Sequence, residues 1–138
     1  MDLDRRITAV PRSPRATSPS IIKRFDTPER VLALDKGRLE LITVGGRTIG
    51  KGSFWPGWKW SHSATAPARP GEPPPEHVGV VLSGRVKMRV EKDREFELTP
   101  GDFFHIASEY DSWVVGYRPC EVLYLSGIDA LVDRVNRE

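Results

Sequence analysis

Three histidines, His62, His77 and His105, and the later Tyr110 are the side chains in this sequence best suited to chemistry. Imidazole changes charge near neutral pH, so a histidine can transfer protons or bind Fe, Zn, Ni, Mn or Cu. Three imidazoles with Asp111 as a neighbouring carboxylate would suffice for a metal site with an open position. The candidate metal ligands are His62, His77 and His105, and the candidate catalytic residues are His77, His105 and Tyr110.

Aromatic residues surround these polar groups in the sequence. Trp58, Trp60 and His62 alternate, so on an extended strand they would share one face. An aromatic wall of this kind suits a planar apolar ligand, although aromatic residues also fill ordinary cores. The candidate ligand-binding residues are Trp58, Trp60, His62, His77, His105, Tyr110 and Trp113.

Length, charge and cysteine content narrow the class of protein. The 138 residues fit one domain, and the 21 basic and 19 acidic residues are interspersed, which argues against a nucleic-acid surface. No apolar stretch is long enough for a membrane span and the N-terminal region lacks the apolar block of a secretory signal, so we expect a cytoplasmic protein. Cys120 cannot form an intrachain disulfide, and its apolar surroundings in sequence predict a buried structural thiol.

The pattern of apolar residues predicts an all-β domain. Val86, Met88 and Val90 alternate with charged residues, and residues 77–83 and 120–126 are continuous apolar runs typical of buried strands. Glycine, proline and aspartate pairs separate these runs about every 8 to 12 residues, which is typical of a sandwich or barrel. The sequence therefore predicts many short strands.

The remaining segments are predicted to be helix, loop or tail. Residues 27–34 indicate a short helix, and residues 128–136 a C-terminal helix packed on the outside of the barrel. Residues 61–76 contain five prolines and no large apolar side chain, so we expect a long loop that is either a spacer or a lid. Residues 1–20 are predicted to be a flexible tail or an arm packed on a partner subunit, and residues 21–138 the barrel domain.

Four blocks of sequence, namely PGWKWSHS, EHVGVVLSGRVKMRV, FELTPGDFFHIASEYDSWVVG and EVLYLSG, resemble the conserved blocks of small single-domain cupins across residues 24–127. The resemblance implies a double-stranded β-helix, or jelly roll, around a pocket that in many cupins holds a divalent metal. Cupins include dioxygenases, isomerases, epimerases, storage proteins and metal-free sensors, so the resemblance does not specify an activity.

Most of the metal-ligand positions of similar cupins are changed in this chain. His77 keeps its place, whereas Ser63, Pro73 and Tyr110 stand where similar proteins have His, Cys and His. We therefore expect either no cofactor or a single divalent metal on a rebuilt site. The degraded site favours a small-molecule-binding or regulatory cupin.

Two other roles remain open at this point. The chain could be a cupin enzyme, either a metal-dependent oxygenase or isomerase, or a metal-independent isomerase or cyclase that uses His77 and Tyr110. We also expect a homodimer, in which residues 21–24 could extend the sheet of the partner subunit. The expected partners are a small molecule and a second copy of the chain, with neither nucleic acid nor membrane.

Overall fold

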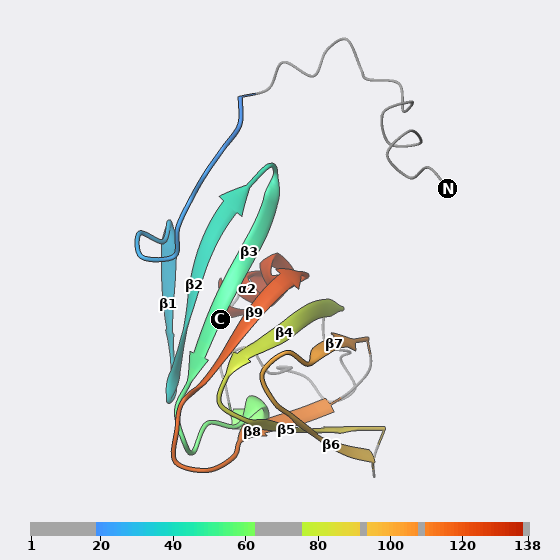
Figure 1. Cartoon of the computed structure of the whole chain (residues 1–138). Helices are drawn as coiled ribbons and strands as arrows, with labels where there is room; N and C mark the ends of the chain where they lie inside the picture. The colour runs from blue at the N-terminus through green and yellow to red at the C-terminus, as the bar shows by residue number, and fades with distance from the viewer. Residues whose placement is uncertain (1–18, 63–75, 92–93, 108–109, 137–138) are drawn as a thin grey trace, which may run out of the picture.

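The computed structural model describes residues 19–62, 76–91, 94–107 and 110–136, which form two antiparallel sheets and a C-terminal helix (Figure 1). The larger sheet has the strand order β1-β2-β3-β9-β4-β7 and the smaller one the order β6-β5-β8. The strands of the larger sheet are β1 (Arg30–Leu34), β2 (Gly37–Val44), β3 (Arg47–Phe54), β9 (Cys120–Ser126), β4 (His77–Ser83) and β7 (Phe103–Ile106). Those of the smaller sheet are β6 (Arg94–Leu98), β5 (Val86–Val90) and β8 (Tyr110–Val114). The all-β jelly-roll prediction is confirmed.

The two sheets enclose one hydrophobic core. Cys120 and Val122 of β9, Val81 of β4, and Val86 and Val114 of the smaller sheet all belong to it. Cys120 and Val122 are two residues apart, which turns both side chains to the same side of β9. The predicted strands 77–83 and 120–126 coincide with β4 and β9.

The helix predicted for residues 27–34 is wrong, because the chain forms β1 over Arg30–Leu34. Leu32 and Leu34 alternate along this strand and pack against the core, and Leu32 lies opposite Leu39 of β2. Burial of alternate leucines on the sheet therefore prevails over the helical start suggested by Pro28.

The C-terminal helix α2 (Ile128–Asn136) has the predicted bounds but not the predicted position. Its Ile128 and Val132 are part of the buried core, and a Cβ added to Gly50 of β3 would meet Ile128 at 2.8 Å. The helix thus packs on the core side of the larger sheet, behind β3 and β9 in Figure 1, rather than on the outside of the barrel. Gly50 leaves the room that this close approach needs.

The extended strand expected for residues 58–62 is also wrong. A turn at Pro56 and Gly57 is followed by the short 3-10 helix η1 (Trp60–His62), so the side chains do not alternate as on a strand. Trp58 and Trp60 are buried in the core, while His62 is exposed.

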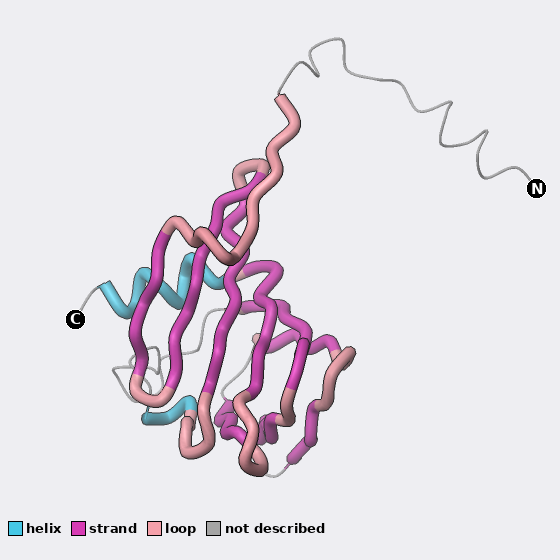
Figure 2. Tube along the Cα trace, turned by 60° about the vertical axis from the view of Figure 1, so that its left-hand side comes forward, coloured by secondary structure: helices cyan, strands magenta, loops and turns pink. Residues whose placement is uncertain are grey.

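The chain projects from the body of the domain before β1 (Figure 2). Lys23 is tied to Glu29 by an ion pair of 2.8 Å, and this hydrogen bond lowers the pKa of the Glu29 carboxyl. The predicted arm at residues 1–18 and most of the proline-rich loop, residues 63–75, lie outside the described residues. Within the described residues, no helix has the length and apolar character that a membrane span requires.

Candidate functional site

The most buried polar side chain of the barrel is His77, at the first position of β4. It is 1% exposed and points into the space between the sheets. Tyr110, at the first position of β8 on the opposite sheet, brings its hydroxyl oxygen to 3.4 Å from Nε2 of His77. The two sheets therefore place an imidazole and a phenol, 33 residues apart in sequence, at one point inside the barrel.

The space around this pair is small and mostly apolar. Its volume is about 20 Å³, which is roughly the room that one water molecule needs. None of the described residues that line it is Lys, Arg, Asp or Glu. The lining residues are Phe54, Trp58, His77, Val86, Met88, Phe104, Tyr110, Ser112, Val122 and Tyr124.

Two further polar groups belong to this interior. The ring of Tyr124 on β9 lies 5.9 Å from that of His77, and burial raises the pKa of the Tyr124 phenol, which therefore stays protonated and can donate a hydrogen bond. The indole N–H of Trp58 is buried and has no hydrogen-bond partner among the described residues. A buried donor without a partner is rare and usually marks a bound water or ligand.

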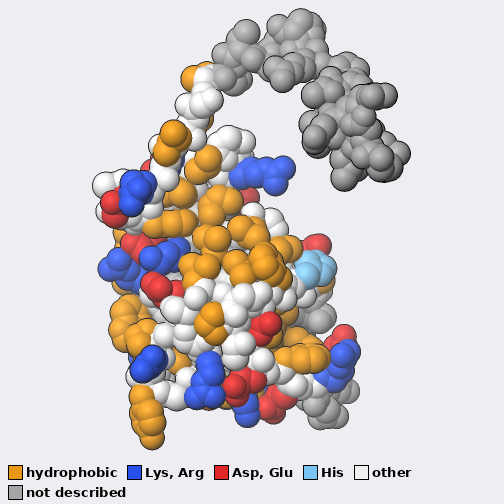
Figure 3. Space-filling view, in the orientation of Figure 1, with side chains coloured by type: hydrophobic (Ala, Val, Ile, Leu, Met, Phe, Trp, Pro, Cys, Tyr) orange, Lys and Arg blue, Asp and Glu red, His pale blue; other side chains and the backbone are white. Residues whose placement is uncertain are grey.

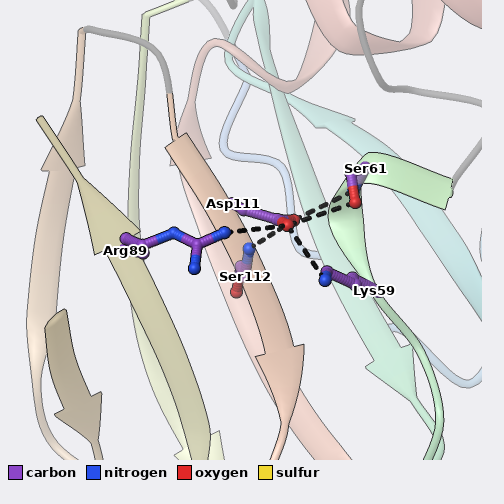
Figure 4. Close-up of polar contacts among 5 residues, drawn as sticks. All are labelled: Lys59, Ser61, Arg89, Asp111 and Ser112. Carbon is purple, nitrogen blue, oxygen red and sulfur yellow. Dashed lines mark hydrogen bonds and ion pairs between the residues drawn. The ribbon is translucent and has the colours of Figure 1, made fainter. Parts of the chain in front are cut away.

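The side chain of Asp111 fixes the segment that carries Trp60 to the smaller sheet (Figure 4). Its Oδ1 accepts hydrogen bonds from the backbone N–H groups of Ser61, at 3.0 Å, and Ser112, at 2.9 Å. Its Oδ2 accepts one from the Ser61 hydroxyl at 3.1 Å. Next to this junction the rings of Trp60 and Tyr110 stack with their centroids 5.1 Å apart.

Asp111 is also paired with two cations, which explains how its charge is accommodated. Lys59 Nζ lies 3.5 Å and an Arg89 nitrogen 3.9 Å from Oδ2, and the Asp111 side chain is only 13% exposed. Asp111 is therefore a structural anchor on the outer side of β8, and it is not available as a metal-binding neighbour of Tyr110.

Gly127, between β9 and α2, lies directly behind His77. It has φ of +82°, and a Cβ at this position would be 2.7 Å from the Cβ of His77. Both the backbone conformation and the close approach require glycine. Gly127 therefore helps to set the position of the imidazole.

The structure does not bring the three histidines together, contrary to the expected metal site. His105 lies opposite Val78 on the outer side of the larger sheet, where its Nε2 is 2.7 Å from Oε1 of Glu76. His62 is exposed at the end of η1. Successive residues of a strand face opposite sides, so Phe104 points inward and His105 outward.

Trp113 is likewise outside the barrel interior. On β8, Tyr110 and Ser112 line the interior, so Trp113 faces the other side. There its ring lies 5.6 Å from Lys59 Nζ and 5.5 Å from Arg89 Cζ. Among the predicted ligand-binding residues, the structure gathers Trp58, His77 and Tyr110 around one space with Trp60 stacked behind, whereas His62, His105 and Trp113 lie elsewhere.

The interior side chains do not fit the divalent metal that the cupin fold implies. His77 is the one imidazole among the described residues that line the interior, and the described residues contain no group of three His, Cys, Asp or Glu side chains able to hold a metal. The other oxygen donors there are Ser112, Tyr110 and the protonated Tyr124. Neutral hydroxyl groups are poor ligands for these metals.

Sequence reasoning missed seven of the lining residues, namely Phe54, Val86, Met88, Phe104, Ser112, Val122 and Tyr124. The alternation of side chains along each strand could have identified such residues. Tyr124 is two residues from the core residue Val122, so both side chains face the core. Phe104 lies opposite Gly79, which is two residues from His77, so Phe104 faces the same side of the sheet as His77. Tyr124 matters most, since it adds a third polar ring to His77 and Tyr110.

Comparison with known proteins supports the fold alone. Neither a family model nor a curated protein sequence matches the chain. Among solved structures, ectoine synthase from P. lautus superposes with a TM-score of 0.56 at 9% identity, covering 82% of this chain and 85% of that one. A cupin-2 domain from Rhodospirillum rubrum gives a TM-score of 0.54 at 13% identity, covering 78% of this chain and 75% of that one. The chain is thus similar to cupins in fold, and its small domain is cupin-like.

Proposed function

We propose that this protein is a small-molecule-binding cupin that holds an uncharged ligand inside the barrel without a metal. The observation that carries the proposal is the group of hydrogen-bonding side chains around His77 in a small, mostly apolar space between the sheets. Trp58, Tyr110 and Tyr124 reach the same space, and the buried Trp58 N–H has no described partner. A ligand with a hydrogen-bond acceptor would satisfy this donor.

The lining of the barrel restricts the charge of the ligand. The described lining has no Lys, Arg, Asp or Glu to balance a ligand ion. Burial of an unpaired charge in such surroundings is strongly unfavourable. A carbonyl or hydroxyl group suits the site better than a carboxylate or an ammonium.

The size of the space restricts the part of the ligand that reaches His77. A volume of about 20 Å³ admits a group the size of one water molecule. A larger ligand has to displace a side chain, and Met88 is the most adaptable side chain of the lining because thioether chains are unbranched and flexible. We expect the polar end of a ligand beside His77 and its apolar part between the aromatic rings.

Native mass spectrometry of the protein purified from its host would test this proposal. We expect a small-molecule mass added to each 15.5 kDa chain, over and above the mass of any oligomer, and we expect this added mass to be lost from His77→Gln. The matched control is His105→Gln, in which an exposed histidine on the outer side of the sheet is changed. Titration of the emptied protein with uncharged carbonyl compounds, from acetone to cyclohexanone, should change the fluorescence of the interior tryptophans. If no adduct and no titration response is found, the proposal fails.

A second candidate function is a metal-independent isomerase or cyclase. It is favoured by the 3.4 Å contact between His77 Nε2 and the Tyr110 hydroxyl, since an imidazole and a phenol can serve as base and acid on one substrate. Binding and catalysis separate in the Tyr110→Phe variant. A binder keeps its ligand with modestly weaker affinity, whereas an enzyme binds substrate but loses turnover.

A further inference from the structure

A second hollow lies on the outer side of the larger sheet, at the end where β3 stops and β9 begins. Its volume of about 550 Å³ is in the range of pockets that hold small organic ligands. Glu121 of β9 lines this hollow, whereas the next residue, Val122, lines the barrel interior. Neighbouring residues of a strand face opposite sides, so the hollow is separate from the site around His77. We call it the outer groove, and its charged and aromatic side chains are Arg38, Glu40, Lys51, Trp55, Arg118 and Glu121.

Short connections between strands form one end of the outer groove. Residues 115–119 join β8 to β9, and Trp55 directly follows β3. The turn after β4 packs tightly on the first connection, because a Cβ added to Gly84 would collide with the carbonyl oxygen of Pro119. The Trp55 N–H donates a hydrogen bond to the carbonyl oxygen of Lys36 at 2.9 Å. Packing and hydrogen bonding therefore fix the backbone at this end of the groove.

The charges of the outer groove do not cancel completely. Arg38 donates a hydrogen bond of 2.8 Å to Glu40, and Lys51 Nζ lies 3.4 Å from a Glu121 oxygen. Basic and acidic side chains lie next to one another along the left edge of this face in Figure 3. Arg118 is exposed and has no hydrogen-bond or ion-pair partner among the described residues. Three cations against two carboxylates leave the groove with one positive charge, which belongs to Arg118.

We propose that the outer groove binds a small planar organic anion that carries a single carboxylate. The guanidinium of Arg118 can donate two parallel N–H bonds to a carboxylate. Trp55 is 41% exposed and offers an aromatic surface on which the planar apolar part of the ligand can stack. This ligand is distinct from the uncharged one proposed for the barrel interior.

The charge balance of the groove limits the ligand to one negative charge. A second negative charge would face Glu40 and Glu121 without a free cation, because Arg38 and Lys51 are already paired with these carboxylates. Like charges placed side by side weaken binding. A cationic ligand is disfavoured for the same reason, since Glu40 has a side chain only 7% exposed and Glu121 also accepts a hydrogen bond from Ser83.

Titration of the full-length chain with benzoate, followed by ligand-observed NMR, tests the proposal. We expect a dissociation constant of about 1 mM or lower. Arg118→Gln should weaken binding by about tenfold or more, as loss of a hydrogen bond to a charged group does. Benzamide has nearly the same shape without the charge, so it should bind about tenfold more weakly or worse. The matched control is Arg94→Gln on β6 of the other sheet, where an arginine side chain 63% exposed is changed and benzoate binding should persist.

Substitutions of Trp55 locate the aromatic part of the ligand. Trp55→Phe keeps an aromatic ring and should retain most of the affinity for benzoate, whereas Trp55→Ala should lose it. Cyclohexanone, a probe of the barrel interior, should not displace benzoate, because the two spaces lie on opposite sides of the larger sheet. Failure of one proposed site is therefore distinguishable from failure of the other.

A wild-type chain that does not bind benzoate would overturn the proposal. So would benzamide binding as tight as that of benzoate, or unchanged benzoate affinity in Arg118→Gln, because the carboxylate would then not be recognised. Unchanged affinity in Trp55→Ala, or tighter binding of phthalate with its two carboxylates, would contradict the stacking and the limit to one charge. Circular dichroism confirms that each variant is folded before its binding is interpreted.

Discussion

Removing the carboxylate of Asp111 tests whether hydrogen bonding or charge holds the Trp60 segment on the smaller sheet. Oδ1 accepts from two backbone N–H groups, at 3.0 Å from Ser61 and 2.9 Å from Ser112, while Oδ2 accepts from the Ser61 hydroxyl and faces both cations. Asp111→Ala removes all of these contacts. Asp111→Asn keeps an oxygen at the Oδ1 position for the two backbone N–H groups. It removes the charge and puts an NH2 group in place of Oδ2, which can no longer accept the hydrogen bond from the Ser61 hydroxyl.

The expected loss in the free energy of unfolding differs between Asp111→Ala and Asp111→Asn. Ser112 is buried, so loss of its acceptor leaves a buried N–H unpaired, whereas the exposed Ser61 can turn to water. Hydrogen bonds to a charged group contribute about 1.5–3 kcal/mol each. The ion pairs add little, because Lys59 is 39% and Arg89 44% exposed. We expect a loss of about 3 kcal/mol in the free energy of unfolding for Asp111→Ala and about 1 kcal/mol for Asp111→Asn.

Urea unfolding followed by tryptophan fluorescence measures both values. With a slope of about 2 kcal/mol per molar urea, Asp111→Ala should lower the midpoint by roughly 1.5 M and Asp111→Asn by about 0.5 M. The native emission of Asp111→Ala should also change, because the Trp60–Tyr110 stack loses its anchor. Equal destabilisation by the two substitutions would refute the reasoning, since the charge and not the backbone hydrogen bonds would then hold the segment.

Four further predictions follow from the interior of the barrel. The buried Cys120 thiol should not react with Ellman's reagent at pH 8 until the protein unfolds, when one thiol per chain appears; reaction in the native state would contradict its burial. Burial raises the pKa of Cys120 from 9.0 to about 12, so the folded state keeps a proton that the unfolded state loses above pH 9. The contribution of Cys120 to the free energy of unfolding should therefore fall by about 1.4 kcal/mol between pH 8 and pH 10, and the fall measured by urea unfolding should be smaller by this amount in Cys120→Ala. Gly127→Ala should lower the free energy of unfolding by more than 2 kcal/mol, because it strains a positive φ and collides with His77; a control at Gly46, whose Cβ would meet nothing within 4 Å, should cost less. Elemental mass spectrometry of the untagged protein should find well below one metal per chain, and near-stoichiometric metal that disappears in His77→Ala would refute the metal-free site.

The sequence by itself was sufficient for the fold and for most of the strands. Alternation in Val86, Met88 and Val90 requires a strand with one buried side, and continuous apolar runs predicted β4 and β9 with their observed bounds. The C-terminal helix was equally predictable from the spacing of its apolar residues. These features are local, since each depends on residues that are neighbours in the chain.

The sequence could not determine where β1, α2 and the Trp58–His62 segment lie. Residues 30–34 have a local preference that a partner strand overrides, because Leu32 and Leu34 are buried only when paired with β2. The position of α2 depends on the room left by Gly50, on a strand nearly 80 residues away in sequence. Such positions follow from packing across the core.

In the candidate site, too, some features were predictable from the sequence and others depend on the tertiary structure. Sequence alone identified His77 and Tyr110 as special positions, and the tertiary structure then joined them to Tyr124 and Trp58 around one small space. It also separated His77 from His62 and His105, because strand parity turns His105 outward and a helical turn exposes His62. Residue types and their local periodicity are properties of the sequence, but which side chains converge depends on strand pairing over tens of residues, and that only the folded chain decides.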